Sequence, residues 1–290
     1  MQTFFGPLLL LATSGAFATV SFPEPTRGHV APPTHTAGGS IRKASKATAG
    51  GRPVLKPATT PPAPFAKNIV LVHGALVDGS GWQKVFAILT KDGYHVSIVQ
   101  NPLTSLDDDV LMTKRVLDQQ DRPTVLVGHS YGGTVITVAG THPNVTTLVY
   151  LAAFQPEKGE STADLFATMP LVTAGGTKST GDHFSFFPAD KFAPIVAADV
   201  PKDQADFMAA SQVYVADACT TTKASAAAWH DKPSYGLVAT DDKAVNPALE
   251  RFMYKRSGTK TTEVKSSHMV YISHPQVVAA LIEEAAHRVN

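Results

Sequence analysis

The sequence is poor in three features that would each suggest a class of protein. It holds one cysteine in 290 residues, Cys219, so an intrachain disulfide and a cluster of thiolate metal ligands are excluded. Charge of one sign is not in excess either. Setting aside the seven basic residues and one acidic residue of 1–67 leaves 18 basic and 23 acidic residues in 68–290. A mildly acidic body gives no support for nucleic-acid binding.

Long hydrophobic runs are also missing, and the one apolar stretch lies at the N-terminus. Residues 4–17 are apolar but shorter than the roughly 20 residues that a membrane span needs, so we expect no stable membrane insertion. Small residues in "AFA" at 16–18 match the spacing that a signal peptidase uses. We therefore predict a signal peptide over 1–18 and a secreted or periplasmic protein, with an organelle transit peptide as the alternative.

The next segment, residues 19–67, is dominated by Pro, Ala, Thr and Gly and has no helical or strand periodicity. Such a composition cannot bury enough apolar surface to offset the entropy lost on ordering. It predicts a flexible linker or pro-region.

Residues 68–290 alternate short β-branched runs with helix-like stretches. The runs predict strands at 68–73, 94–100, 123–129, 146–154, 234–240 and 261–267. The stretches between them predict helices at 80–91, 106–120, 131–141, 247–257 and 275–289. Ser80 and Gln83 match a capping box at the start of the first helix. This alternation is typical of an α/β domain, in which a mostly parallel central sheet is covered by helices on both faces.

One interval, 155–232, breaks the alternation. It has no convincing core strand but has helix-like runs near 161–169 and 188–212, with several phenylalanines. We predict a helical cap insertion that covers a pocket above the sheet. The alternative is a set of extra helices that only enlarges the fold.

The stretch "VLVGHSYGGTV" at 125–135 places Ser130 between Gly128 and Gly132, where a predicted strand meets a predicted helix. A serine on such a sharp turn needs small neighbours, because the turn brings backbone segments together. The N-terminus of the following helix would stabilise negative charge developing near the hydroxyl. This context predicts that Ser130 is a nucleophile rather than an ordinary turn residue.

A serine nucleophile needs a base within hydrogen-bond reach. His129 adjoins Ser130, but the turn should direct its side chain the other way, toward packing. His268 follows the last predicted strand in "KSSHMVYISHPQVV", at the carboxyl edge of the sheet. We predict His268 as the base, with His274 as its competitor.

The base needs a carboxylate that orients its ring. The strand at 234–240 leads into Asp241 and Asp242, 27 and 26 residues before His268. We favour Asp242 and expect Asp241 to be solvated or to cap a loop. Glu157, which follows an earlier strand, is a remote third choice.

An acyl-transfer site also needs donors for an oxyanion. The first predicted strand ends in His73 and Gly74, so the backbone N–H of Ala75 can pair with that of Tyr131. We expect His73 to form structural hydrogen bonds rather than to take part in catalysis.

The motifs "LVHGA", "VGHSYGG", "ATDDKAV" and "SHMVY" together resemble the α/β-hydrolase superfamily over residues 68–290. Within it, the pattern is most similar to compact serine esterases of the methyl-ester esterase and hydroxynitrile lyase branch, which act without a cofactor. The resemblance implies the α/β-hydrolase fold and a small-molecule ester substrate. It implies these site residues: Ser130 as nucleophile, Asp242 as acid, His268 as base, and the N–H groups of Ala75 and Tyr131 as oxyanion hole.

Two positions bear on the choice within that branch. The lyases carry Thr after the His of the first motif and Lys after the catalytic His, whereas this chain has Gly74 and Met269. The sequence therefore predicts a serine carboxylesterase for small to medium apolar esters. Alternatives are a lipase, a cofactor-free perhydrolase or haloperoxidase, and a non-catalytic ligand-binding protein on the same fold.

No metal or cofactor is expected, because neither a ligand cluster nor a phosphate-binding glycine loop is present. "NVT" at Asn144 matches a glycosylation sequon, which matters only if its loop is exposed.

Overall fold

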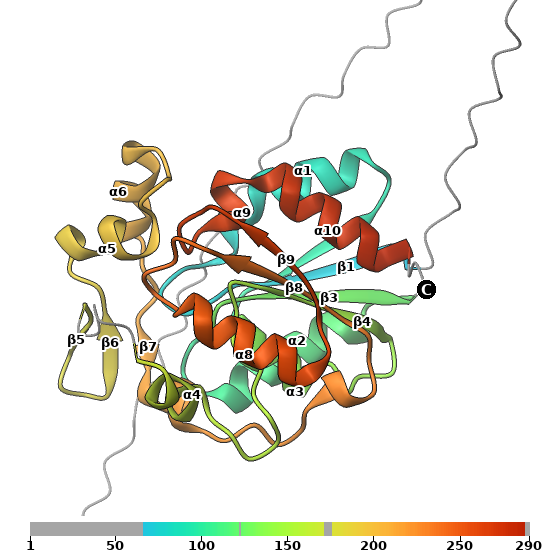
Figure 1. The fold of residues 1–290 in the computed structure, drawn as a ribbon, viewed down its shortest axis with the longest axis horizontal. Coiled ribbons are helices and arrows are strands. Elements are labelled where there is room, and N and C mark those ends of the chain that lie inside the picture. The colour runs from blue at the N-terminus through green and yellow to red at the C-terminus, as the bar shows by residue number, and fades with distance from the viewer. Residues whose placement is uncertain (1–65, 122, 171–175, 288–290) are drawn as a thin grey trace, which may run out of the picture. The chain divides into compact units, whose positions relative to one another are not determined.

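The computed structural model describes residues 66–121, 123–170 and 176–287, and its centre is a six-stranded sheet (Figure 1). The strand order is β2-β1-β3-β4-β8-β9, and every neighbouring pair is parallel. The strands are β1 (Asn68–Val72), β2 (His95–Val99), β3 (Thr124–His129), β4 (Val145–Leu151), β8 (Ser234–Ala239) and β9 (Lys260–Val264). All six predicted strands are confirmed, with small differences at their ends.

The position of each strand in the sheet explains its composition. Every residue of β1 and β3, near the centre, is buried, and these strands read as continuous apolar runs. The edge strands β2 and β9 are mostly exposed or half-buried and carry His, Lys, Thr and Glu. Polar side chains at both edges also discourage pairing with another sheet.

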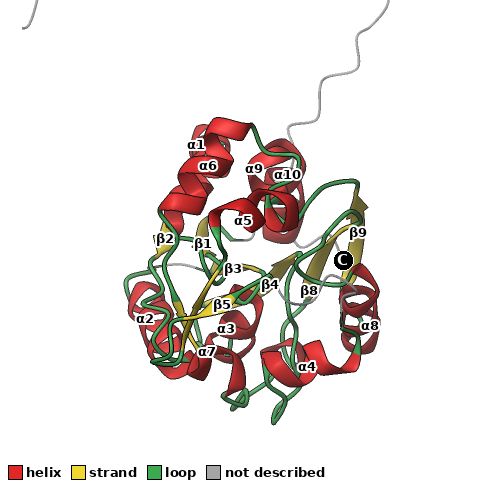
Figure 2. Ribbon diagram, turned by 90° about the vertical axis from the view of Figure 1, so that its left-hand side faces the viewer, coloured by secondary structure: helices red, strands yellow, loops and turns green. Residues whose placement is uncertain are grey.

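Helices cover both faces of the sheet (Figures 1 and 2). α1 (Gln83–Lys91) and α10 (Pro275–His287) pack on one face, where Ile69 and Leu71 of β1 point. The other face, which receives Val70 and Val72, is covered by α2 (Leu106–Asp118), α3 (Gly132–Ala139) and α8 (Pro247–Ser257). The α/β-hydrolase fold predicted from the sequence is confirmed, and the alternation of side chains along each strand gives it two cores.

The capping box predicted at the start of the first helix is wrong. A 3₁₀ turn, η1 (Gly79–Trp82), precedes α1, and Asp78 caps it by accepting a 2.7 Å hydrogen bond from the Ser80 N–H. Asp78 is in extended backbone just before the turn, the conformation that an N-cap residue adopts. Ser80 therefore lies inside the turn and caps nothing. A capping box does occur at Ser161 and Asp164, where α4 (Thr162–Thr168) begins.

In the segment 155–232, called the cap below, α4 (Thr162–Thr168) and the elements that follow it up to residue 221 lie beyond the carboxyl ends of the strands (Figures 1 and 2) in the described ranges 155–170 and 176–221. After α4, the cap contains the helices α5 (Ala189–Val196), α6 (Lys202–Ala210) and α7 (Asp217–Thr221), and the 3₁₀ turn η2 (Ala228–His230). It also contains a small antiparallel sheet of β5 (Lys178–Ser179), β6 (Phe184–Phe186) and β7 (Val215–Ala216). The sequence did not reveal this sheet, because its strands have only two or three residues each.

The predicted signal peptide and nearly all of the predicted linker lie outside the described residues. Ala66, assigned to the end of that linker, is fully buried, and its N–H donates to the Ala286 carbonyl at 3.1 Å. The folded body therefore includes Ala66 and begins before the predicted boundary at residue 68. In the described ranges, no helix has the length and apolar character needed to cross a membrane.

Candidate active site

Ser130 lies on the sharp turn between β3 and α3, with a backbone φ of +54°. This left-handed conformation is strained for a residue with a side chain. A Cβ on Gly128 would lie 2.5 Å from the Gly132 carbonyl oxygen, and one on Gly132 would lie 2.7 Å from the His73 oxygen. The prediction that the turn needs small residues at these two positions is confirmed.

A second pair of residues, His268 and Asp242, lies beyond the ends of neighbouring strands. His268 Nδ1 and Asp242 Oδ2 are 2.6 Å apart, and their side chains are only 4% and 0% exposed. The other oxygen of Asp242 accepts from the N–H groups of Ala244 and Val245 at 2.7 and 2.9 Å. An ionised carboxylate can only accept, so Nδ1 of His268 is the donor in such a pair and Nε2 is the ring nitrogen left to act as an acceptor.

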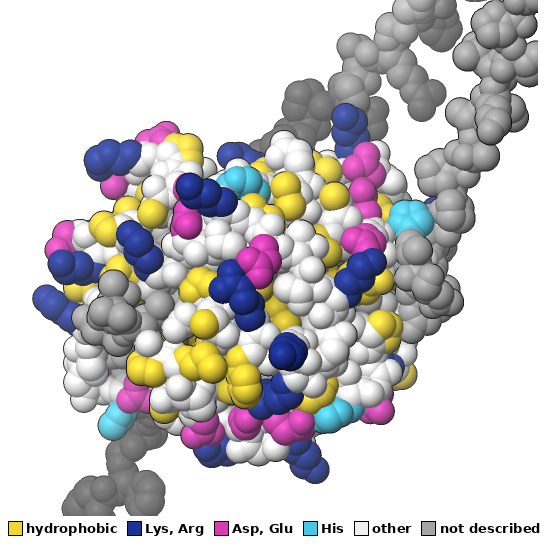
Figure 3. Space-filling view, in the orientation of Figure 1, with side chains coloured by type: hydrophobic (Ala, Val, Ile, Leu, Met, Phe, Trp, Pro, Cys, Tyr) yellow, Lys and Arg dark blue, Asp and Glu magenta, His cyan; other side chains and the backbone are white. Residues whose placement is uncertain are grey.

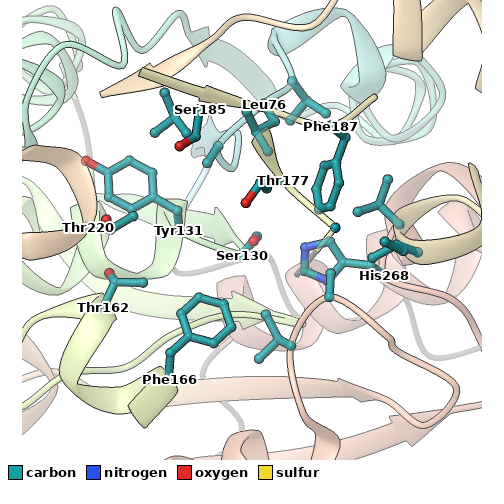
Figure 4. Close-up of a pocket in the computed structure, with 18 of the residues that line it drawn as sticks. Leu76, Ser130, Tyr131, Thr162, Phe166, Thr177, Ser185, Phe187, Thr220 and His268 are labelled. Carbon is teal, nitrogen blue, oxygen red and sulfur yellow. The ribbon is translucent and has the colours of Figure 1, made fainter. Parts of the chain in front are cut away.

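The parallel sheet brings these residues to one place. Ser130 follows β3, Asp242 follows β8 and His268 follows β9, and the carboxyl ends of parallel strands meet at the same edge. Ser130 and His268 line one cavity, and Figure 4 shows the imidazole turned toward the Ser130 hydroxyl. The structure thus assembles the three side chains predicted as nucleophile, acid and base.

His129, next to Ser130, supports the loop of His268 from behind. Its Nε2 donates a 3.0 Å hydrogen bond to the His268 carbonyl oxygen, and its ring centroid lies 4.6 Å from that of His268. Burial, followed by the proximity of His268, holds the pKa of His129 well below its usual value. A neutral His129 is the packing residue that the turn geometry predicted.

The two residues whose N–H groups were predicted as an oxyanion hole line the same cavity as Ser130. Ala75 and Tyr131 both line the cavity, and neither N–H has an acceptor among the described residues. Gly74 brings the loop after β1 against the serine: a Cβ on it would lie 2.8 Å from the Ser130 Cβ. The pair predicted as an oxyanion hole therefore flanks Ser130.

His73 holds the loop after β1 in place. Its Nδ1 donates to the Gly74 carbonyl at 2.8 Å, and its Nε2 accepts from the Asn101 N–H at 2.9 Å. Burial lowers its pKa. His73 is thus a neutral link between the ends of β1 and β2, as expected from the sequence.

A buried carboxylate that the sequence did not single out lies behind Tyr131. Asp109 of α2 accepts hydrogen bonds from the Leu103 N–H at 2.9 Å and the Tyr131 hydroxyl at 2.8 Å, and Cys219 Sγ lies 3.8 Å from it. Burial raises the pKa of Asp109 to about 6, although these donors oppose the shift. Asp109 therefore joins the turn of Ser130 to the cap helix α7.

A cavity of about 470 Å³ lies above Ser130, between the sheet and the cap (Figure 4). Its wall is largely aromatic and aliphatic and also carries hydroxyl groups. The apolar part includes Phe154, Phe166, Phe187, Phe192, Ile195, Val196, Val245 and Met269. The hydroxyl groups belong to Thr162, Thr177, Ser185 and Thr220.

The competing predicted residues lie elsewhere. His274 shares a 3.0 Å hydrogen bond with the Ser273 hydroxyl, Asp241 is exposed, and Glu157 pairs with His230 at 2.9 Å on the surface. None of His274, Asp241 and Glu157 is among the described residues that line the cavity.

Three further features have simple explanations. Burial, reinforced by Asp109, raises the pKa of Cys219 to about 12, so its thiol stays protonated. The side-chain nitrogen of Asn144 donates to the carbonyls of Leu117 and Gln120 at 3.1 and 3.0 Å, which leaves no free N–H for a glycan. In the part of the chain that the structure describes, no group of three His, Cys, Asp or Glu side chains could hold a metal ion.

This fold and this arrangement of residues define a class, and the family comparison agrees. The model of the alpha/beta hydrolase family matches residues 69–281, so the chain belongs to that family. It is 23% identical over 256 residues to salicylic acid-binding protein 2 of Nicotiana tabacum, covering 77% of this chain and 98% of that protein. It is 38% identical over 117 residues to the carbendazim hydrolyzing esterase of Nocardioides sp. (strain SG-4G), covering 36% of this chain and 47% of that protein.

Solved structures show the same fold. A pyrethroid hydrolase from Sphingobium faniae JZ-2 superposes with a TM-score of 0.66 at 20% identity, covering 77% of this chain and 98% of that one.

Proposed function

We propose that this chain is a serine carboxylesterase that hydrolyses small to medium apolar esters through an acyl-enzyme on Ser130. The observation that carries the proposal is the 2.6 Å contact of His268 Nδ1 with Asp242, on an imidazole that faces Ser130 inside the cavity. The names of relatives, among them an esterase and methylesterases, support the same reaction class.

In the first half-reaction, His268 Nε2 accepts the Ser130 proton as Oγ attacks the ester carbonyl carbon. The carbonyl oxygen becomes an oxyanion, which the N–H groups of Ala75 and Tyr131 stabilise. Asp242 accepts from Nδ1 and stabilises the imidazolium. The carbon–oxygen bond to the alcohol then breaks, and the leaving alkoxide takes the proton from His268.

In the second half-reaction, water gives a proton to His268 and its oxygen attacks the acyl carbon. The bond to Ser130 Oγ breaks, and the serine recovers its proton from His268. The products are a carboxylic acid and the free enzyme. The same two donors stabilise the second oxyanion, so the reaction needs no cofactor.

The apolar lining of the cavity supports an apolar substrate. Phe166, Phe187 and Phe192 contribute aromatic surface, and a volume of about 470 Å³ suits a small or medium ester. Basic and acidic side chains are interspersed on the face shown in Figure 3, without a basic patch that would suggest a polyanionic substrate.

The test is hydrolysis of p-nitrophenyl esters of graded acyl length by the full chain, beside Ser130→Ala. We expect turnover of short and medium chains by the wild type and its loss in the variant. Turnover that survives in Ser130→Ala would overturn the proposal. A preference for long acyl chains, with activity that increases only when the substrate concentration exceeds its solubility, would instead indicate a lipase.

We also propose that the chain is exported, on the basis of the apolar residues 4–17 and the small residues at 16–18. Expression of the full chain should place the mature protein outside the cytoplasm, with Thr19 as its first residue. A matched variant lacking residues 2–18 should remain inside. An uncleaved N-terminus on the exported protein would contradict a cleavable signal.

A further inference from the structure

Asp199, in the cap just after α5, binds the loop that carries His268. Its Oδ2 accepts from the Ser266 hydroxyl and from the Ser267 N–H, both at 2.9 Å, and its Oδ1 accepts from the Ser267 hydroxyl. Ser266 and Ser267 are themselves buried, and Ser267 directly precedes His268. Three donors of one short loop thus converge on one carboxylate, 67 and 68 residues away in the sequence.

The residue on the other side of His268 is held by the same segment of the cap. The carbonyl oxygen of Val196 accepts from the Met269 N–H at 3.1 Å. Val196 also lines the cavity, as do Ile195 beside it and Phe192 one turn earlier in α5. The segment 192–199 therefore forms a wall of the cavity and accepts hydrogen bonds from both neighbours of His268, Ser267 and Met269.

The charge on Asp199 fits this role. Burial would by itself raise its pKa, but the hydrogen bonds from Ser267 and Ser266 outweigh burial and lower it. The carboxylate is consequently ionised at neutral pH, and charge-assisted hydrogen bonds are about twice as strong as neutral ones. No residue of the predicted catalytic set supplies this restraint, because Asp242 holds the His268 ring and not its backbone.

We propose that Asp199 is a positioning residue for His268: by binding Ser266 and Ser267 it couples the general base to the α5 wall of the cavity. The inference rests on the proposed function, in which His268 activates Ser130. Its consequence is that the cap determines reactivity as well as pocket shape. Loss of Asp199 should slow the reaction at Ser130 without removing the site.

The test is covalent labelling of the full chain by an alkyl fluorophosphonate. Ser130 Oγ forms a bond to phosphorus, fluoride leaves, and the serine proton passes to His268. The endpoint counts intact sites, and the rate constant reports how well His268 activates Ser130. A purely structural defect would lower the endpoint and leave the rate constant of the remaining sites unchanged.

For Asp199→Ala we expect about one label per chain and a rate constant roughly tenfold lower, the effect of losing hydrogen bonds to a charged group. Asp199→Asn keeps an amide oxygen for the Ser267 N–H, so its rate constant should lie between those of the wild type and Asp199→Ala. The matched control is Asp190→Ala, which removes an exposed carboxylate of α5 that pairs with Lys191 at 3.8 Å. It should label like the wild type.

Wild-type rate constants in both Asp199 variants would overturn the proposal, and so would a reduced endpoint with an unchanged rate constant. If Asp199→Ala does not fold, Asp199→Asn decides: slower labelling per site supports the proposal and equal labelling overturns it. Failure of the wild type to label at Ser130 is a separate outcome. That result would refute the proposed function itself, and the inference with it.

Discussion

The hydroxyl of Tyr131 donates a 2.8 Å hydrogen bond to Oδ2 of Asp109, while the N–H of the same Tyr131 lies beside Ser130 at the cavity. A carboxylate on α2 thereby fixes the residue that we expect to stabilise the oxyanion. Asp109 is fully buried, so its ionisation also affects the stability of the fold.

The first prediction concerns stability and pH. The pKa of Asp109 is about 6 in the folded chain and near 3.8 in the unfolded chain. Because the folded value is the higher one, this carboxyl's contribution to stability is fully present below the unfolded pKa and is lost as the pH rises past about 6. The loss amounts to about 3 kcal/mol.

Asp109→Asn cannot titrate, which makes it the right comparison. The free energy of unfolding of the wild type minus that of the variant should fall by about this amount between about pH 4 and about pH 7. Denaturant titration at several pH values measures it. A difference that is constant over this range would show that Asp109 does not have the raised pKa.

A second buried carboxyl, Glu250 of α8, provides the next prediction. It is fully buried, and burial, followed by the charge of Asp242, raises its pKa well above the usual value. Because the folded pKa is raised, its contribution to stability is lost as the pH rises through that value.

Glu250→Gln should therefore melt at the wild-type temperature or above it, with the advantage increasing as the pH rises through the raised pKa of Glu250. Thermal melts across that range test this expectation. Glu263→Gln is the control, because Glu263 is an exposed partner of Arg251 at 2.7 Å. A melting temperature for Glu250→Gln that is equally low at every pH would mean that the acid makes an essential contact.

The third prediction uses two adjacent aspartates. Asp242→Asn should lower kcat by about three to four orders of magnitude, because an amide no longer holds the required tautomer of His268. Asp241→Asn should leave kcat unchanged, since Asp241 is exposed and engages Ser266 only through its backbone N–H, at 3.1 Å. Steady-state ester hydrolysis by both variants measures the contrast. Equal losses would argue against Asp242 as the acid.

The fourth prediction concerns Gly74. A Cβ there would lie 2.8 Å from the Ser130 Cβ, so Gly74→Ala should push the Ala75 amide away from the developing oxyanion. We expect kcat/KM to fall by at least about tenfold, because complete removal of one oxyanion-hole donor lowers the rate by more than tenfold. We expect kcat to fall, with KM and the melting temperature nearly unchanged. An effect confined to KM would place Gly74 in substrate binding.

The local sequence was sufficient for much of the fold and site. The strands were predictable because buried parallel strands are continuous apolar runs, as in β1 and β3. The turn of Ser130 was predictable because its glycines are adjacent in the chain. Asp242 and His268 each lie in the loop after a strand, so their place at the carboxyl edge could be inferred from the alternation of strands and helices.

Other features depend on contacts between residues distant in the chain and leave no local pattern. Asp109 reads as one of three aspartates in the first turn of α2, yet it alone is buried against Tyr131. Asp199 reads as an ordinary cap residue until the fold sets it against Ser267, and Glu250 reads as a surface position of a helix.

The amino-acid pattern therefore determined the positions of the strands along the chain, the nucleophile turn and the residue types of the site, because hydrophobic periodicity and backbone sterics act over a few neighbouring residues. Only the tertiary structure decided which carboxylates are buried and which loops they hold. Burial and hydrogen bonding between distant segments exist only after the chain has packed, and they set both the pKa of Asp109 and the contacts of Asp199 with the loop of His268.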